Sequence, residues 1–286
     1  MQASQELTIP IGKNMQLAAK AWGPENGTPV IAVHGWLDNA NSFDVIAPLI
    51  KGARVVAIDI RGHGRSSHID KCDSYILLDI VRDIFLVADY LGWEKFSLLG
   101  HSMGGAACTL AAGTVPKRIR KLATLCILTP FEAQEAVLPF ELEASITKQP
   151  QLVTKPPKYY PDLDALVANR VSNVFFPISE AAAQTIMERG AVEESQGFRV
   201  TSDIRLRMPF PIRLTEGQVS GFLARIECPV QFLMEEKGLF PLEFLEARIA
   251  KIKNIQHHKL TGSHHAHMED EAVAIAEILE PFFSHD

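Results

Sequence analysis

The strongest candidate for a reacting group is a serine in a glycine-rich segment. Residues 100–105 read GHSMGG and fit the pattern G-x-S-x-G around Ser102. A strand-like run (FSLLG) precedes the serine, and a helix-like run of small residues follows it. A tight strand-to-helix turn projects a serine hydroxyl from the edge of a sheet, and small neighbours let the strand and helix pack closely. The pattern therefore predicts a nucleophilic serine at position 102.

A serine nucleophile needs a general base, and histidine is the side chain whose pKa lies near neutrality. Residues 262–270 read GSHHAHMED and lie between a strand-like run and a C-terminal amphipathic helix. They offer His264, His265 and His267 as candidate bases. Clustered histidines could also bind zinc, but no matching ligand motif occurs elsewhere in the sequence. We therefore expect neither a metal nor another cofactor.

Acyl transfer also needs hydrogen-bond donors for the developing oxyanion. Residues 34–38 read HGWLD and follow an earlier apolar run, so this loop can aim the N–H of Trp36 at the point that the N–H of Met103 faces. We expect these two amides to form an oxyanion hole. A further loop, DIRGHGRS at residues 59–66, has glycines suited to tight turns. We interpret it as structural support in which Asp59 holds neighbouring loops and His63 has no catalytic role.

The elements around these loops indicate an α/β fold. Residues 7–11 and 15–22 resemble an opening hairpin. Later apolar runs show little alternation, which is typical of strands covered by helices on both faces and indicates a mostly parallel sheet. A helical pattern with apolar residues at i, i+3 and i+4 spacing extends from about Ser74 to Leu91. The apolar runs are Pro29–His34, Arg54–Ile60, Lys95–Gly100, Lys121–Leu128 and Pro229–Met234.

The alternation of strands and helices stops after the sixth predicted strand, at Thr129-Pro130, and resumes near Cys228. The insertion holds several helix-like pieces cut by prolines and no convincing strand. We expect a helical cap over residues 131–225 on a core of residues 1–130 and 226–286; a second independent domain is the alternative. The cap carries many aromatic residues, and those that face Ser102 would form an apolar pocket.

Composition excludes several classes of protein. The chain has 286 residues, of which 47% are hydrophobic and 22% charged, so intrinsic disorder and a disulfide mini-protein are ruled out. The net charge of −6, without a dense basic run, argues against nucleic-acid binding. The sequence begins without a secretory-signal pattern and has no apolar run long enough to span a membrane. We expect a cytoplasmic protein with four scattered, unpaired cysteines.

The motifs together resemble the α/β-hydrolase superfamily and, within it, the serine hydrolase-like proteins. The resemblance covers nearly the whole chain. It implies that Ser102 is the nucleophile, that His264 is the base, and that Trp36 and Met103 supply the oxyanion donors. His267 falls on a histidine that leads a helix and has no catalytic role. The matching segments are residues 34–43 (HGWLDNANSF), 62–68 (GHGRSSH), 100–104, 188–190 (ERG) and 262–268.

The triad acid departs from the superfamily pattern. An aspartate is usual a few residues after the strand that ends near Met234, but residues 235–238 read EEKG. The other usual site, at the end of the strand predicted over residues 121–128, offers Cys126 or Leu128 and no carboxylate. We expect Glu236 to serve as the acid, with Glu235 and Glu132 as alternatives; Lys237 could instead bind an anion that orients the histidine.

These features predict a serine esterase that cleaves small or medium carboxylic esters through an acyl-enzyme. The same groups would serve a thioesterase, a lactonase or a carbon–carbon bond hydrolase. Serine rather than aspartate at position 102 argues against haloalkane dehalogenase and epoxide hydrolase chemistry. The rival hypothesis is a silenced hydrolase that binds a ligand in the same pocket. The sequence gives no indication of the oligomeric state.

Overall fold

A computed structural model of the chain describes residues 4–70, 73–172, 176–208, 210–235 and 242–284. The strands are β1 (Gln5–Gly12), β2 (Met15–Trp22), β3 (Thr28–Val33), β4 (Ala53–Ile58), β5 (Phe96–His101), β6 (Ile119–Leu125), β7 (Ala191–Glu194), β8 (Gly197–Val200), β9 (Val230–Glu235) and β10 (Ile255–Leu260). The α-helices are α1 (Leu77–Tyr90), α2 (Met103–Thr114), α3 (Leu138–Val153), α4 (Leu163–Val171), α5 (Glu180–Gly190), α6 (Glu216–Leu223), α7 (Leu242–Ile249) and α8 (Ala272–Ser284). Short 3-10 helices are η1 (Ala40–Phe43), η2 (Ala47–Leu49), η3 (Pro116–Arg118), η4 (Glu135–Val137), η5 (Ile204–Arg207) and η6 (Ala266–Met268).

Eight strands form one sheet in the order β1-β2-β4-β3-β5-β6-β9-β10. The β1–β2 and β2–β4 pairs are antiparallel, and all later pairs are parallel. The predicted mostly parallel α/β sheet is therefore confirmed. Because carboxyl ends of parallel strands meet at one edge, the loops after β3, β5, β6 and β10 gather there, and β9 ends at the same edge.

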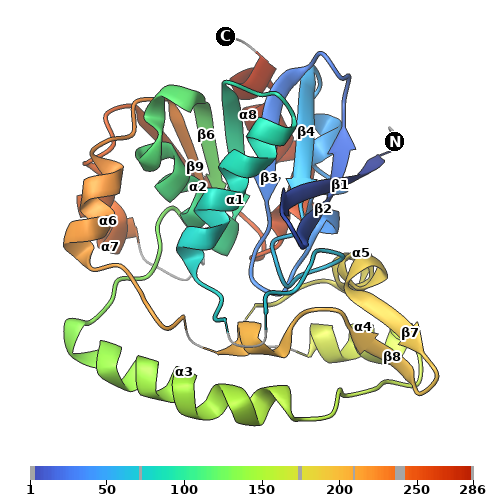
Figure 1. The fold of residues 1–286 in the computed structure, drawn as a ribbon. Helices are drawn as coiled ribbons and strands as arrows, with labels where there is room; N and C mark the ends of the chain where they lie inside the picture. Colours follow the sequence, from blue (N-terminus) through green and yellow to red (C-terminus); the bar gives the residue numbers. More distant parts are fainter. Residues whose placement is uncertain (1–3, 71–72, 173–175, 209, 236–241, 285–286) are drawn as a thin grey trace.

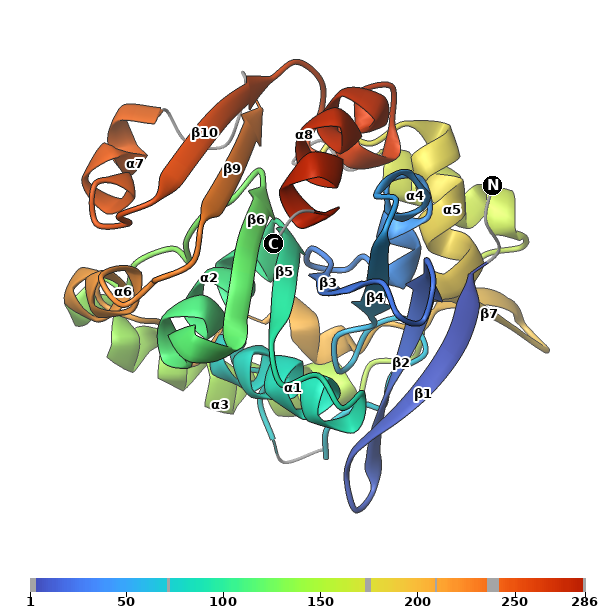
Figure 2. The same ribbon diagram turned by 90° about the horizontal axis from the view of Figure 1, so that it is seen from above.

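Apolar side chains fill both faces of this sheet, since successive residues of a strand point to opposite faces. Ile31 and Val33 of β3 pack in one buried cluster with α1 and α2. Val30 and Ala32 pack in a second cluster with η1 and α8. Figure 2 shows α8 on the opposite side of the sheet from α1 and α2. Burial on both faces explains why these strands lack an alternating pattern.

The chain leaves the sheet after β6 and returns at β9, as the sequence predicts. Helices α3 and α4 lie along one end of the molecule, at the bottom of Figure 1, and α5 lies above α4 at the right. Leu166 of α4 and Ile186 of α5 centre a small separate apolar cluster in this region. None of the helices in the described ranges is long and apolar enough to cross a membrane.

The sequence analysis expected no strand in the insertion, and this expectation is wrong. β7 and β8 pair as an antiparallel hairpin. Each strand is only four residues long, too short for a periodicity of two to stand out. Gly197 opens β8 at a φ of +115°, where a side chain would be strained and would meet the carbonyl of Tyr160.

Candidate active site

Ser102 occupies a strained turn between β5 and α2. Its φ is 53° and its ψ −120°, a conformation that costs a non-glycine residue about 1–3 kcal/mol. The Ser102 N–H donates to the Leu125 carbonyl at 3.0 Å, and its own carbonyl accepts from Ala106 at 3.1 Å. These bonds hold the turn, and the hydroxyl lies at the carboxyl edge of the sheet.

Two glycines make this turn sterically possible. A Cβ on Gly104 would lie 2.0 Å from the Val33 carbonyl oxygen of β3. A Cβ on Gly100 would lie 2.5 Å from the Gly104 carbonyl oxygen. Gly104 therefore lets α2 approach β3, and Gly100 lets the turn pack closely against the start of α2.

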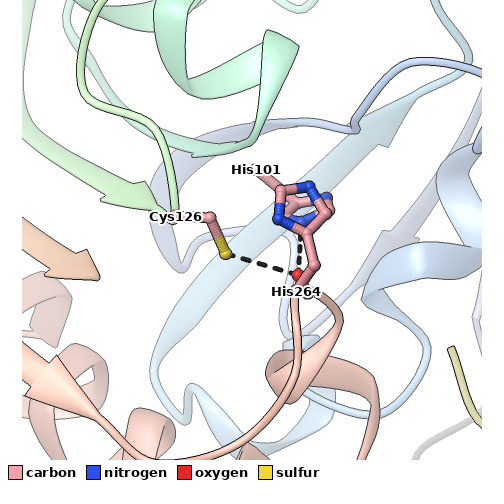
Figure 3. A group of neighbouring side chains, drawn as sticks. All are labelled: His101, Cys126 and His264. Atoms are coloured by element: carbon pink, nitrogen blue, oxygen red, sulfur yellow. Dashed lines mark hydrogen bonds between the residues drawn. The ribbon is translucent and has the colours of Figure 1, made fainter. Parts of the chain in front are cut away.

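The loop after β10 brings His264 next to this turn. The His264 carbonyl accepts from Nε2 of His101 at 2.9 Å and from the Cys126 thiol at 3.3 Å. His101 ends β5 and precedes Ser102, while Cys126 follows β6 with a φ of +70°. Figure 3 shows the three side chains converging from separate elements. The His264 ring is buried and packs on Phe176, with 4.9 Å between ring centroids.

A buried carboxylate faces the His264 ring. Oε1 of Glu235, the last residue of β9, lies 3.0 Å from Nδ1 of His264. The two atoms are not aligned for a hydrogen bond, as is common for catalytic pairs without substrate. Burial raises the pKa of Glu235, but the His264 ring and the Cys126 thiol outweigh burial and hold that pKa below its ordinary value. The pair therefore favours a charged carboxylate beside the imidazole.

The structure describes one of the two other acid candidates. Glu236 falls outside the described residues, together with Lys237. The Glu132 side chain is 45% exposed, and one of its oxygens lies 3.8 Å from the Arg248 guanidinium. Burial and the charge of Glu235 raise the pKa of Cys126 well above its ordinary value, so Cys126 remains a thiol that can donate a hydrogen bond.

The loop after β3 reaches the same edge of the sheet. Leu37 has a φ of 63°, and Gly35 lies against the His101 ring. The indole Nε1 of Trp36 donates to the Leu206 carbonyl at 2.7 Å, which ties this loop to η5. Within the described residues, the backbone N–H groups of Trp36 and Met103 donate no hydrogen bond. Both are thus available to a ligand.

Asp38 joins three elements beneath this loop. Its carboxylate lies 3.2 Å from Nε2 of His265 and 3.4 Å from Nη2 of Arg170 on α4. Burial raises the pKa of Asp38, but His265 and Arg170 outweigh burial and hold it well below its ordinary value. Asp38 therefore links the loop after β3, the histidine loop and the insertion. The sequence analysis missed this role because nothing in the sequence pairs residues 38, 170 and 265.

Three further histidines are buried and keep low pKa values. His34 donates through Nδ1 to the Gly35 carbonyl at 2.7 Å and accepts the Ile60 N–H through Nε2 at 3.0 Å. Burial lowers the pKa of His34 to about 4 and that of His63 to about 3, so both stay neutral. Burial also lowers the pKa of His267 to about 3.

Asp59 holds two neighbouring loops. Its carboxylate accepts the backbone N–H groups of Ala40 and Arg65 and pairs with Arg189 of α5 at 2.9 Å. These contacts agree with the structural role expected for residues 59–66.

A metal ion fits the cluster in Figure 3 poorly. The ring nitrogens of His101 and His264 and the Cys126 sulfur lie within 4.8 Å of one another. However, Nε2 of His101 and the Cys126 thiol both direct a hydrogen at the His264 carbonyl. A metal would need the Cys126 thiolate, which the raised pKa of this thiol disfavours. The donor chemistry thus favours a hydrogen-bonded support for the histidine loop.

Known proteins resemble this chain in sequence and fold. A family model described as the alpha/beta hydrolase fold matches residues 28–159. A serine hydrolase-like protein of Dictyostelium discoideum is 32% identical over 98% of this chain and 82% of its own length. The chain belongs to the serine hydrolase-like proteins of the α/β-hydrolase fold. The family expected from the sequence motifs is therefore confirmed.

Solved structures extend the comparison for this serine hydrolase-like protein. A hypothetical protein of Pseudomonas aeruginosa is 39% identical, with a TM-score of 0.91 over 98% of this chain and 99% of that one. The thioesterase domain from the curacin biosynthetic pathway is 25% identical, with a TM-score of 0.83 over 97% of this chain and 99% of that one.

Proposed function

We propose that the protein hydrolyses small or medium carboxylic esters through an acyl-enzyme on Ser102. The contact between His264 and the buried Glu235 carboxylate carries the proposal, because it gives the candidate base an orienting anion. The strained Ser102 turn and the free amides of Trp36 and Met103 support it further.

In this mechanism the Ser102 hydroxyl attacks the ester carbonyl while His264 accepts its proton. Glu235 holds the imidazole in the tautomer with a hydrogen on Nδ1 and stabilises the imidazolium that forms. The Trp36 and Met103 amides hold the oxyanion, a contribution typically worth about 3–4 kcal/mol for each donor. His264 then protonates the leaving alcohol, and water, activated by the same ring, releases the acid.

Residues 131–225 act as a lid over this site in our proposal, on a core of residues 1–130 and 226–286. The cap helix α4 supports it, since Arg170 contacts both Asp38 and His265 beside the candidate machinery. A thioester is the second candidate substrate, because the curacin thioesterase domain matches nearly the whole chain.

The first test compares the wild type with Ser102→Ala on p-nitrophenyl esters from acetate to laurate and on acyl thioesters. We expect ester hydrolysis that the variant loses, and fluorophosphonate labelling of wild-type Ser102 alone. A preference for thioesters would identify a thioesterase. No hydrolysis and no labelling would favour a protein that only binds a ligand.

A further inference from the structure

A cavity of about 100 Å³ adjoins the candidate active site between the insertion and the core. The loop after β3 forms one wall with Trp36, and Phe176, which packs on the His264 ring, forms another. The cavity therefore borders the candidate oxyanion loop, and Phe176 separates it from the candidate base. At roughly 10–15 Å³ for each water-sized group, it holds a short chain of atoms.

The polar lining of this cavity has unused hydrogen-bond donors. Arg207 is exposed at the mouth of the cavity and, in the described part of the chain, its side chain has no ion pair or hydrogen bond. Its neighbour Leu206 is fixed to the Trp36 indole. The Thr201 hydroxyl is buried without a partner. Arg170 is only 13% exposed, yet each of its contacts, to Asp38, His265 and the Phe176 carbonyl, is 3.4 Å long. Charge-assisted hydrogen bonds are normally about 2.7–2.9 Å, so the Arg170 guanidinium is weakly satisfied.

The charges of the lining favour an anion. Two guanidinium groups, of Arg170 and Arg207, face one carboxylate, that of Asp38. The Asp38 oxygens already contact Arg170 and His265, and no carboxylate of the described residues pairs with Arg207. This local excess of positive charge occurs in a chain whose net charge is −6.

We propose that the cavity binds a carboxylate on the acyl chain of the substrate, so that the preferred substrate is a half-ester of a short dicarboxylic acid. Arg207 would pair with the carboxylate, and the Thr201 hydroxyl would donate a hydrogen bond to it. The inference rests on the proposed function for its reaction, but carboxylate binding can be measured without any turnover.

The kinetic test compares mono-4-nitrophenyl glutarate with its neutral methyl ester. We expect the wild type to prefer the anionic ester in kcat/KM. Arg207→Gln should lower the anionic-to-neutral ratio of kcat/KM by roughly 10- to 100-fold, as expected for a lost charge-assisted hydrogen bond. Thr201→Val should lower it roughly 3- to 10-fold. Arg225→Gln, which removes an exposed arginine near the end of α2, is the matched control and should leave the ratio unchanged.

Binding of monomethyl glutarate to Ser102→Ala protein, measured by calorimetry, separates the two proposals. Binding that Arg207→Gln weakens at least tenfold supports the anion site even if no ester is hydrolysed. If the protein hydrolyses neutral esters and Arg207→Gln leaves the anionic-to-neutral ratio of kcat/KM unchanged, the anion site is overturned. The proposed esterase activity is then still supported. No binding heat at millimolar ligand would overturn it as well.

Discussion

Glu235 ends β9, Cys126 follows the neighbouring strand β6, and both side chains meet at His264. The sequence narrowed the acid to a few glutamates but could not choose between residues 235 and 236. Successive residues of a strand point to opposite faces, so a one-residue uncertainty in where β9 ends changes which side chain reaches the histidine. The carboxylate that the structure brings to His264 is that of Glu235, which the sequence analysis gave as an alternative to Glu236.

At the residue scale, Glu235→Gln should lower kcat by roughly 10³- to 10⁴-fold with little change in KM. The amide keeps the shape of the side chain but no longer selects the tautomer or stabilises the imidazolium, and the equivalent loss in serine proteases costs about 10⁴-fold. Steady-state kinetics on a p-nitrophenyl ester measure the effect. Glu132→Gln is the matched control and should retain full activity. If Glu235→Gln keeps more than a tenth of the wild-type kcat and Glu236→Gln does not, Glu236 is the acid.

At the element scale, the structure differs from the sequence-based expectations more in its loops than in its strands. The apolar runs predicted the strands of the sheet well, because burial on both faces leaves a strong signal. The strand expected to reach Leu128 instead ends at Leu125. Cys126 adopts a left-handed backbone conformation, with a φ of 70°, which a cysteine in the sequence does not predict. The contacts of Asp38 with Arg170 and His265 join segments far apart in the sequence, and such pairings depend on the completed fold.

These contacts predict a pH-dependent contribution of Asp38 to stability. The pKa of Asp38 is held well below its ordinary value, so its stabilisation is complete above about pH 3.9, the unfolded value, and is lost as the pH falls through the lowered folded value. Breaking a buried ion pair costs several kcal/mol, so Asp38→Asn should lower Tm by about 5–10 °C at neutral pH. The difference from wild type should shrink below about pH 3.9.

Thermal unfolding followed by circular dichroism at several pH values measures this shift in Tm. Asp89→Asn is the control, because Asp89 is 60% exposed in its ion pair with Arg118 and should shift Tm by less than about 2 °C. A Tm difference for Asp38→Asn that stays constant down to about pH 2 would show that shape and packing, not charge, make residue 38 important.

At the scale of the whole molecule, a well-buried core carries the candidate nucleophile and base, while part of the insertion buries few of its side chains. Helix α2, which begins after Ser102, is buried over Gly104–Gly113. Along α3, only Ser145 is buried, and Phe140 and Ile146 are 69% and 66% exposed. Figure 1 shows α3 extended along the outer edge of the insertion. Local stability follows buried apolar contact, so the two helices should open with different free energies.

Hydrogen exchange measured by mass spectrometry tests this difference directly. We expect backbone amides of α3 to exchange at least about 100-fold faster than those of α2, because α3 opens locally whereas α2 opens only when the sheet comes apart. The exchange rate of α3 should not depend on protein concentration if its apolar face stays uncovered. Equal protection of the two helices would contradict local opening. Protection of α3 that grew with concentration would show that a second copy covers Phe140 and Ile146, since burial of that face is what would slow its exchange.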